Sequence, residues 1–263
     1  MRSYWAIITA RFRMLLQYRM AAVAGFGTQL FWGLMRVMIF TAFYHSTTKA
    51  QPMSLEQVIT YVWLGQAMLG MLPWNVDTEI RLMIRTGTVA YELVKPLDLY
   101  WLWFSRAMAM RTAPTILRSV PMFVIAGLFF HMQMPASWAS AGAWMLSMGA
   151  ALLLACAITT LLTMSMLWTI SGEGIARFLM IGVMVFSGMI VPLPLFPDWA
   201  QSVLNFLPFR GIADIPYRLY TGHISADRVL WVVGHQLIWT LAIVIIGRWV
   251  LSLGTRKLVV QGG

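Results

Sequence analysis

The main feature of the chain is a series of apolar runs separated by short polar segments. Six of the runs are long, at residues 21–44, 56–74, 113–132, 141–169, 175–192 and 229–251. Each holds close to or more than the roughly 20 residues that an α-helix needs to cross the hydrocarbon core of a membrane. The pattern predicts an all-α polytopic membrane protein with about six transmembrane helices. No repeat or linker divides it, so we expect residues 1–263 to form a single transmembrane domain.

The composition argues against a soluble protein. Of the 263 residues, 60% are hydrophobic and 11% are charged, whereas soluble domains have roughly 45–50% apolar and about 25% charged residues. The net charge of +10 does not indicate nucleic-acid binding, because no basic domain lies outside the apolar runs. We therefore expect the lipid bilayer, and no nucleic acid, among the partners.

The distribution of the basic residues predicts the orientation. Six spans place both termini on one side of the membrane. Fourteen basic residues lie on that side (Arg2, Arg11, Arg13, Arg19, Arg81, Arg85, Lys95, Arg106, Arg111, Arg118, Arg177, Arg248, Arg256 and Lys257) and four on the other (Lys49, Arg210, Arg218 and Arg228). Because cytoplasmic flanks are enriched in Lys and Arg, we expect both termini and residues 75–112 to be cytoplasmic. The predicted location is the plasma or inner membrane of a bacterium.

Residues 1–20 have the pattern of an amphipathic helix that lies in the membrane interface. On a helical wheel one arc carries Tyr4, Trp5, Ile8, Phe12, Leu15 and Leu16, and the opposite arc carries Arg2, Thr9, Arg13 and Gln17. This pattern is typical of a helix whose apolar side meets the acyl chains and whose arginines lie among the phosphates. The alternative is an irregular start to the first span.

The segment 75–112 is charged, although it lies between two apolar runs. Its sequence EIRLMIRTGTVAYELVKPLDLYWLWFSRAMAMR predicts a short helix near 76–85 that stops at Gly87, and a second that stops at Pro96. A third helix then leads into the membrane from about Leu99. The residue before a proline is disfavoured in helical geometry, so the second bend is stiff. A compact helix between two bends can dock against another protein, although a solvated loop with ordinary surface charges is the alternative.

A second unusual segment, residues 192–228, lies on the predicted outer side. Four prolines interrupt it, namely Pro192, Pro194, Pro197 and Pro208. Trp199 and Phe206 belong to the apolar face of a short helix within it. Asp198 is placed to cap that helix. The helix is too short to span and too apolar for water, so we expect re-entrant or interfacial helices that protein covers. Such a segment either lines or closes an exit path, or serves as a structural lid.

Two polar side chains, Gln29 and Arg36, interrupt the first apolar run. Arg36 lies roughly eight residues, or about 12 Å, from the outer end of the run, a long distance for its side chain to reach the interface. It therefore reaches that interface, pairs with another subunit, or lines a polar cavity. Gln29 is a weak candidate partner.

The sequence shows no catalytic or metal site. It has no phosphate-binding G-x-x-x-x-G-K-[ST] loop and no H-E-x-x-H motif. The histidines (His45, His131, His223 and His235) are scattered, and the single cysteine, Cys156, lies inside an apolar run. One alternative is a membrane-embedded lipid-modifying enzyme, because His223, Asp214 and Asp227 are close in sequence. Another is an accessory or scaffold subunit without a transport path.

Two segments, taken in order, resemble the membrane subunit of an ABC-2 type exporter, the ABC-2 family transporter protein. The first is IRTGTVAYELVKPLD (84–98), with an arginine, a glycine, a short spacer, two aliphatic residues and a basic-proline-leucine sequence. The second is SGMIVPLPLFPDWAQSVLNFLPF (187–209), followed by GIADIPYRLYTG (211–222). Six spans, an amphipathic N-terminal helix and cytoplasmic termini are similar to the family over nearly the whole chain.

The resemblance implies the permease subunit of an ATP-binding cassette exporter. The short cytoplasmic helix between the second and third spans would be the coupling helix, seated in a separate ATPase subunit; its expected coupling residues are Arg85, Gly87, Glu92, Lys95 and Pro96. Gly87 and Pro96 would fix the bends, and the charges would face the ATPase. Two ATPase copies would bind ATP and Mg, and a second permease chain, identical or related, would complete the path. Residues 192–228 would form the outer gate for an unidentified amphipathic substrate such as a lipid, a drug or a peptide.

Overall fold

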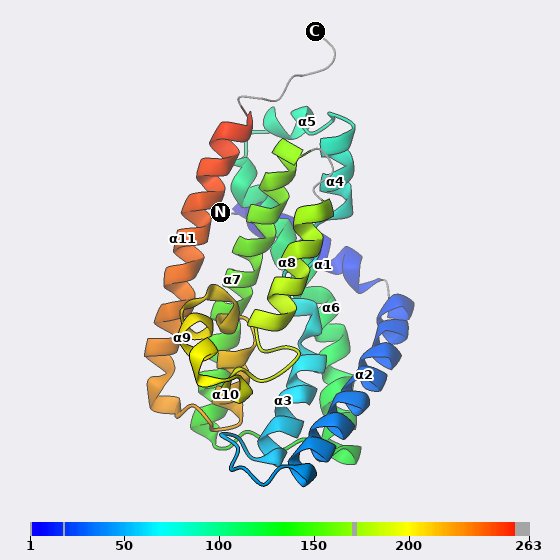
Figure 1. Cartoon of the computed structure of the whole chain (residues 1–263). Helices are drawn as coiled ribbons and strands as arrows, with labels where there is room; N and C mark the ends of the chain where they lie inside the picture. The colour runs from blue at the N-terminus through cyan, green and yellow to red at the C-terminus, as the bar shows by residue number, and fades with distance from the viewer. Residues whose placement is uncertain (1, 18, 170–172, 256–263) are drawn as a thin grey trace.

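The computed structural model describes residues 2–17, 19–169 and 173–255, and within them the chain forms helices and no strand (Figure 1). The α-helices are α1 (Arg2–Leu16), α2 (Arg19–Ser46), α3 (Leu55–Ala67), α4 (Thr78–Arg85), α5 (Ala90–Leu93), α6 (Leu99–Phe129), α7 (Trp138–Thr169), α8 (Glu173–Phe186), α9 (Asp198–Phe206), α10 (Asp214–Tyr220) and α11 (Val229–Thr255). Short 3₁₀ helices are η1 (Leu69–Met71), η2 (Leu193–Leu195), η3 (Pro208–Gly211) and η4 (Ala226–Arg228). The all-α class predicted from the apolar runs is confirmed.

Four helices are long and apolar enough to cross a membrane. In the described part of the chain they cover Gly25–Ser46, Leu99–Phe129, Trp138–Trp168 and Ala226–Thr255. The predicted spans 56–74 and 175–192 differ, because they form α3, of 13 residues, and α8, of 14 residues. At 1.5 Å per residue these two helices are each about 20 Å long, short of the roughly 30 Å hydrocarbon core. The chain is a polytopic membrane protein in which two of the six apolar segments are only partly helical.

Local breaks explain why these two segments stop short. After α3 and η1 the chain runs through Pro73 to Asp77 without helical structure, and proline supplies no backbone N–H to a helix. After α8, Gly188 has a positive φ of 81°, a conformation that favours glycine and commonly follows a helix end. Hydropathy measures the length of an apolar run and carries no information on where the helix within it ends.

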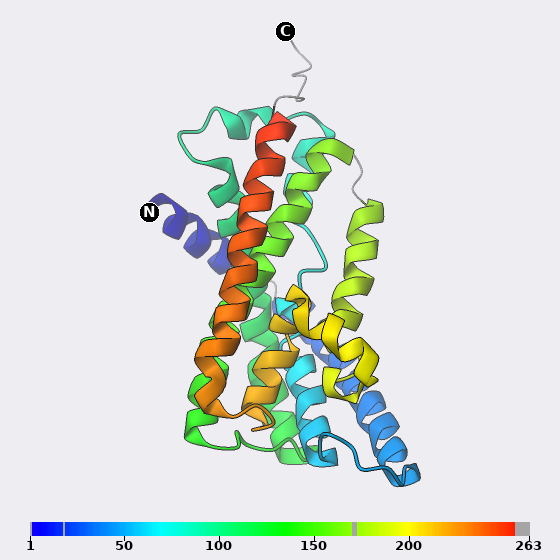
Figure 2. The same ribbon diagram turned by 60° about the vertical axis from the view of Figure 1, so that its left-hand side comes forward.

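The long helices form a bundle with α7 at its centre (Figures 1 and 2). This helix contacts α6, α10 and α11, and a larger share of it is buried than of the other three long spans. At one end, which we call the α5 end, α4 and α5 lie near the C-terminal end of α11 (Figure 1). At the opposite end, the far end, the C-terminal end of α2 lies near the start of α3.

The N-terminal helix α1 lies against α6 at an angle to the bundle (Figure 2). Ile7 packs against the main hydrophobic core, and the Tyr4 hydroxyl accepts a 3.0 Å hydrogen bond from the Asp98 amide. Trp5, by contrast, is 69% exposed. The apolar arc of this helix is therefore divided between the protein and its surroundings, and its location in a membrane interface stays a prediction.

Candidate coupling and gate sites

The segment between η1 and α6 forms a compact projection at the α5 end (Figure 1). Asp77 begins α4, because its Oδ1 accepts hydrogen bonds from two amides of the first turn, at 2.9 and 3.4 Å. The helix ends before Gly87, whose φ of +73° turns the chain. The short helix α5 follows, and Asp98 then caps α6 through a 3.1 Å bond from an amide of its first turn. The predicted helix, glycine break, second helix and restart near Leu99 are all observed.

Four of the five predicted coupling residues are exposed on this projection, namely Arg85, Gly87, Lys95 and Pro96. Glu92 differs, since only 6% of it is exposed. Its Oε1 lies 2.6 Å from the Lys95 ammonium nitrogen, and its Oε2 is buried without a hydrogen bond. The expectation that the charges face a partner is therefore wrong for Glu92, because this residue lies on the inner side of a four-residue helix.

The outer side of α5 is apolar rather than charged. Tyr91, Leu93 and Val94 are 72%, 42% and 80% exposed, and we call these three side chains the α5 apolar surface. In the sequence, this surface is indicated by the amphipathic stretch VAYELV, residues 89–94. Amphipathicity alone, however, does not tell which side of so short a helix faces the bundle.

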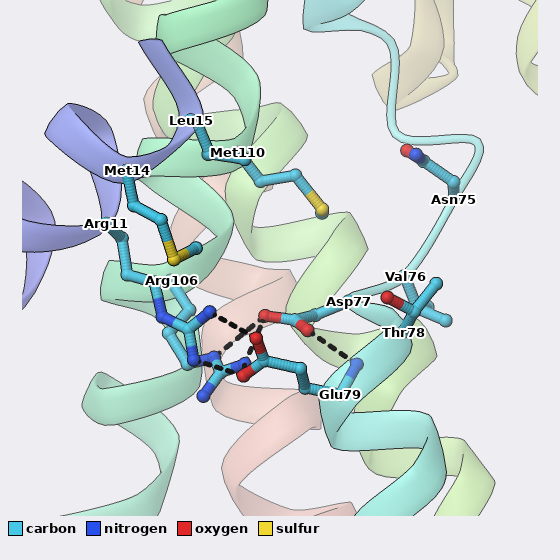
Figure 3. Close-up of a pocket in the computed structure, with 10 residues that line it drawn as sticks. All are labelled: Arg11, Met14, Leu15, Asn75, Val76, Asp77, Thr78, Glu79, Arg106 and Met110. Atoms are coloured by element: carbon cyan, nitrogen blue, oxygen red, sulfur yellow. Dashed lines mark hydrogen bonds and ion pairs between the residues drawn. The ribbon is translucent and has the colours of Figure 1, made fainter. Parts of the chain in front are cut away.

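A cluster of four charged residues ties the projection to α1 and α6 (Figure 3). Arg106 of α6 donates from Nε to Asp77 at 2.8 Å and from Nη2 to Glu79 at 2.8 Å. Arg11 of α1 donates to both carboxylate oxygens of Glu79, with its Nη1 2.8 Å from Oε1. Figure 3 shows the two guanidinium groups pointing at the two carboxylates. This ion-pair cluster joins three helices that are distant in sequence.

Hydrogen bonding within the ion-pair cluster favours the charged forms of Glu79 and Arg11. The hydrogen bond from Arg11 is the largest influence on Glu79 and, together with the bond from Arg106, lowers its pKa from 4.5 to about 2. The same bond raises the pKa of Arg11. Arg106 is only 7% exposed, so water and salt screen its pairs less than they screen pairs on an open surface.

A cavity of about 310 Å³ opens beside the ion-pair cluster. Its lining residues are Arg11, Met14, Leu15, Asn75, Val76, Asp77, Thr78, Glu79, Arg106 and Met110. The charged groups in this lining already bind one another (Figure 3). Because these groups are already engaged, the cavity offers no unpaired charged group among Arg11, Asp77, Glu79 and Arg106 to hold an ion. Across the described ranges, no group of three His, Cys, Asp or Glu is arranged to hold a metal ion.

The sequence gives little indication of the ion-pair cluster. The pairs that hold it together join residues 27 to 68 positions apart, and its arginines count in the sequence only toward orientation. The one local signal is the pair Asp77 and Glu79 at the start of α4, where helices favour acidic residues.

Further polar contacts extend the connection to α11. The Arg248 Nη2 lies 3.1 Å from Asp98 Oδ2, and both side chains are well exposed, so this pair adds little stability. The two helices α11 and α6 also pack closely, because a Cβ at Gly247 of α11 would lie only 2.8 Å from the Tyr100 ring of α6. The α5 end thus brings together α1, α4, α6 and α11.

Nearer the far end, a buried carboxylate organises the predicted gate. The Oδ1 of Asp214 accepts hydrogen bonds from the Tyr61 hydroxyl and the Leu193 amide, each at 3.3 Å. Its Oδ2 pairs with Arg218 at 3.0 Å, and its own amide donates to the Ser187 carbonyl. Asp214 is fully buried. We call it and these partners the Asp214 hub, which fastens the proline-rich segment to α3 and to the end of α8.

The proline-rich segment itself folds into short helices. Pro192 precedes η2, Pro194 lies within it, Pro197 precedes α9 and Pro208 begins η3. Trp199 and Phe206 are 82% and 70% exposed, so this side of α9 faces away from the core. Asp198 is the first residue of α9 and makes no capping bond. The predicted cap is wrong, because Pro197 occupies that position.

A comparison with known families decides the class of the protein. Residues 30–262, most of the chain, match the family described as ABC-2 family transporter protein. The chain belongs to this family. No curated protein matches it. As an ABC-2 family member it is a membrane component of an ABC transporter, and such members are transport subunits rather than ATPases.

The two intramembrane polar residues of this ABC-2 transporter chain do not pair with each other. Arg36 donates from Nη1 to the Met189 carbonyl at 2.7 Å, just beyond the break at Gly188. Gln29 is 3% exposed, and neither its amide nitrogen nor its oxygen has a hydrogen bond. Gln29 as the partner of Arg36 is therefore wrong, and Arg36 instead joins α2 to the segment after α8.

The residues considered for an enzyme do not form a reactive site in the ABC-2 transporter chain. Both oxygens of Asp214 are engaged in its hub, and Asp227 accepts a hydrogen bond from the Ser225 hydroxyl on the surface. Burial lowers the pKa of His223. Cys156 is fully buried. This arrangement gives no support to the lipid-modifying alternative.

Proposed function

We propose that this chain is the permease subunit of an ATP-binding cassette exporter driven by a separate ATPase. Two ATPase copies, which bind ATP and Mg, act on a pair of permease chains, identical or related. The α5 end and both termini face the cytoplasm, and the far end faces the outside. The substrate is an amphipathic molecule such as a lipid, a drug or a peptide.

The observation that carries this proposal is a projection with an apolar outer side and a charged, anchored base. The α5 apolar surface leaves Tyr91 and Val94 largely exposed, and exposed aromatic and aliphatic groups on a projecting element favour protein docking. Lys95 and Arg85 lie on the same projection. We assign the α5 apolar surface as the centre of ATPase docking, with Arg85 and Lys95 at its rim.

The anchoring of the projection to neighbouring helices supports a role in transmitting force. Gly87 and Pro96 set its two bends, and Glu92 holds Lys95 from the inner side. A movement of the docked ATPases would displace α5 and α4 together. The ion-pair cluster would then carry the displacement to α1 and α6.

The proline-rich segment fits the role of the outer gate. The Asp214 hub connects the proline-rich segment to α3. Arg36 of α2 donates to the Met189 carbonyl and so connects α2 to the residues just before this segment. Movements of the long helices would therefore reposition the gate as a unit. The exposed Trp199 and Phe206 would meet the outer leaflet or the partner permease chain.

Co-expression of the tagged full chain with its candidate ATPase subunit tests the docking assignment. Val94→Asp places a charge in the α5 apolar surface, and we expect it to lower the amount of co-purified ATPase by at least about tenfold, as for a buried anchor at an interface. Ala50→Asp adds the same charge at an exposed position of the far end and should leave the recovery unchanged. Equal recovery of ATPase with both variants would remove the assignment.

A further inference from the structure

The second predicted span continues beyond its helix as a non-helical segment that packs against the bundle with Leu72 and Val76 buried and Asn75 exposed. After α3 and η1, residues 73–77 have neither helical nor strand structure. Leu72 and Val76 are 1% and 2% exposed. We call residues 72–77 the unwound segment; Figure 2 shows it as a thin trace that leads to α4. Backbone of this kind is tolerated at membrane depth only where protein satisfies its polar groups.

One buried arginine supplies hydrogen bonds to the unwound segment. Arg111 of α6 is 1% exposed. Its Nη1 donates to Asn75 Oδ1 at 2.6 Å, and its Nη2 donates to the Asn75 carbonyl at 2.5 Å. Its Nε and Nη2 also donate to the Thr159 hydroxyl of α7, at 3.3 and 3.1 Å. A single guanidinium therefore joins the unwound segment to α6 and α7.

The partners of this arginine are neutral. No carboxylate pairs with Arg111 among the residues that the structure describes. A buried cation without a counter-charge is costly, and an ionisable residue within a membrane is by default a candidate for function. Lysine does not reproduce the contact, because only the planar guanidinium presents a fork of donors to two oxygens of the same residue.

The unwound segment is the direct continuation of α4. Val76 packs with Leu162 and Met166 of α7, and the next residue, Asp77, belongs to the ion-pair cluster. An extended chain lacks the ladder of hydrogen bonds that makes a helix stiff. Without a fixed point it would stretch or twist when α4 moves, and the movement would be lost.

We propose that Arg111 is a positioning residue for coupling, which keeps the unwound segment stiff so that a displacement of α5 and α4 moves α6 and α7. The proposal rests on the proposed function of α5 as the coupling helix. Asn75 does not shift relative to α7 unless the bonds to Arg111 break. Because α7 contacts α10, which carries the Asp214 hub, the displacement reaches the gate.

The test uses the full chain in complex with its ATPase subunits, reconstituted into phospholipid vesicles. Ser202, which is exposed on α9, is replaced by cysteine as a reporter. A membrane-impermeant maleimide then measures the labelling rate with and without ATP plus vanadate. Cys156 is fully buried and does not interfere. With Arg111 intact we expect the rate to differ at least about fivefold between the two states, as for a typical coupling free energy.

The variants separate positioning from folding. Arg111→Gln and Arg111→Lys should both abolish the nucleotide-dependent change while the amount of bound ATPase stays unchanged. Both should also lower the thermal midpoint, because the acceptors on Asn75 and Thr159 lose their donor. Asn75→Asp keeps both acceptor oxygens and should keep the change. Thr159→Val should reduce it. Thr160→Val is the matched control, because the Thr160 hydroxyl donates to the Cys156 carbonyl of its own helix.

Each outcome decides a different point. An Arg111→Gln complex that keeps the full change in labelling overturns the proposal. If that variant is not recovered folded, Thr159→Val and Thr160→Val decide, and equal behaviour of the two overturns it. A parent protein that binds no ATPase removes the proposed function itself. A parent complex that hydrolyses ATP with no change in labelling overturns the link between coupling and gate, and this proposal with it.

Discussion

Arg11 and Glu79 stand 68 positions apart in the chain, yet the Arg11 guanidinium binds both carboxylate oxygens of Glu79. Arg106 binds the same carboxylate from α6. Because Glu79 lies in the first turn of α4, the N-terminal helix and α6 are fastened to the same point of the projection. A displacement of α4 away from α1 has to break charge-assisted hydrogen bonds, which are stronger than neutral ones.

Replacing Glu79 with glutamine should release α1 from α4. Glutamine keeps the shape of the side chain but removes the charge that Arg11 and Arg106 bind. We expect the backbone amides of α1 to exchange hydrogen about tenfold faster, because the helix opens locally more often. Hydrogen exchange measured by mass spectrometry checks this. Glu56→Gln, at an exposed glutamate in the first turn of α3, is the control, and equal exchange of α1 in both variants would contradict the expectation.

The depressed pKa of Glu79 predicts a pH dependence. Its pKa is about 2 in the fold and 4.5 as the ordinary value, so the folded state binds this proton less tightly than the unfolded state does. The stabilisation is therefore complete above about pH 4.5 and decreases as the pH falls toward about 2. We expect the difference in thermal midpoint between the wild type and Glu79→Gln to be constant above about pH 5.5 and to shrink below it. Scanning fluorimetry measures it; a difference that changes near neutral pH would show that another group titrates.

The parts of the fold that could be predicted have local causes. Gly87 permits the positive φ of the first bend, and Pro96 disfavours helical geometry in the residue before it, so the bends and the restart of helix near Leu99 follow from single residues. The four long helices follow from long apolar runs, because a span of that length needs no specific partner. The family could also be predicted, because the segments that carry the resemblance, 84–98 and 187–222, are each contiguous in the sequence.

The parts that could not be predicted depend on contacts between distant residues. Glu92 and Lys95 look alike in the sequence as surface charges, and only packing shows that Glu92 is buried. Arg111 reads as one more basic residue near the cytoplasm, although it is 36 positions from its partner Asn75. The position where α3 ends depends on the hydrogen bonds that other helices supply to the unwound segment. Hydropathy does not describe such contacts.

The Asp214 hub predicts a large loss of stability on a small change. Asp214→Asn preserves the shape but leaves Arg218, 17% exposed, without its counter-charge. Breaking a buried pair in this way costs about 3 kcal/mol, which lowers the thermal midpoint of a protein of this size by about 6–12 °C. Asp227→Asn, at an exposed carboxylate, should change the midpoint by less than about 2 °C. Thermal unfolding of the two purified variants in the same detergent measures both, and similar midpoints would show that the hub contributes no stability.

Gly87 and Gly188 provide a matched comparison between backbone strain and steric overlap. Both have positive φ, at 73° and 81°, so alanine at either position strains the backbone by about 1–2 kcal/mol. A Cβ at Gly87 would meet no atom within 4 Å, whereas a Cβ at Gly188 would lie 2.4 Å from the Tyr61 hydroxyl oxygen and 3.3 Å from Asp214 Cβ. We therefore expect Gly188→Ala to lower the thermal midpoint at least about twice as much as Gly87→Ala, because it adds overlap within the Asp214 hub to the same strain. Gly87→Ala should instead reduce ATPase recovery, because it changes the angle at which α5 is presented. Equal losses of stability in the two variants would show that Tyr61 moves aside freely and that the hub is not rigid.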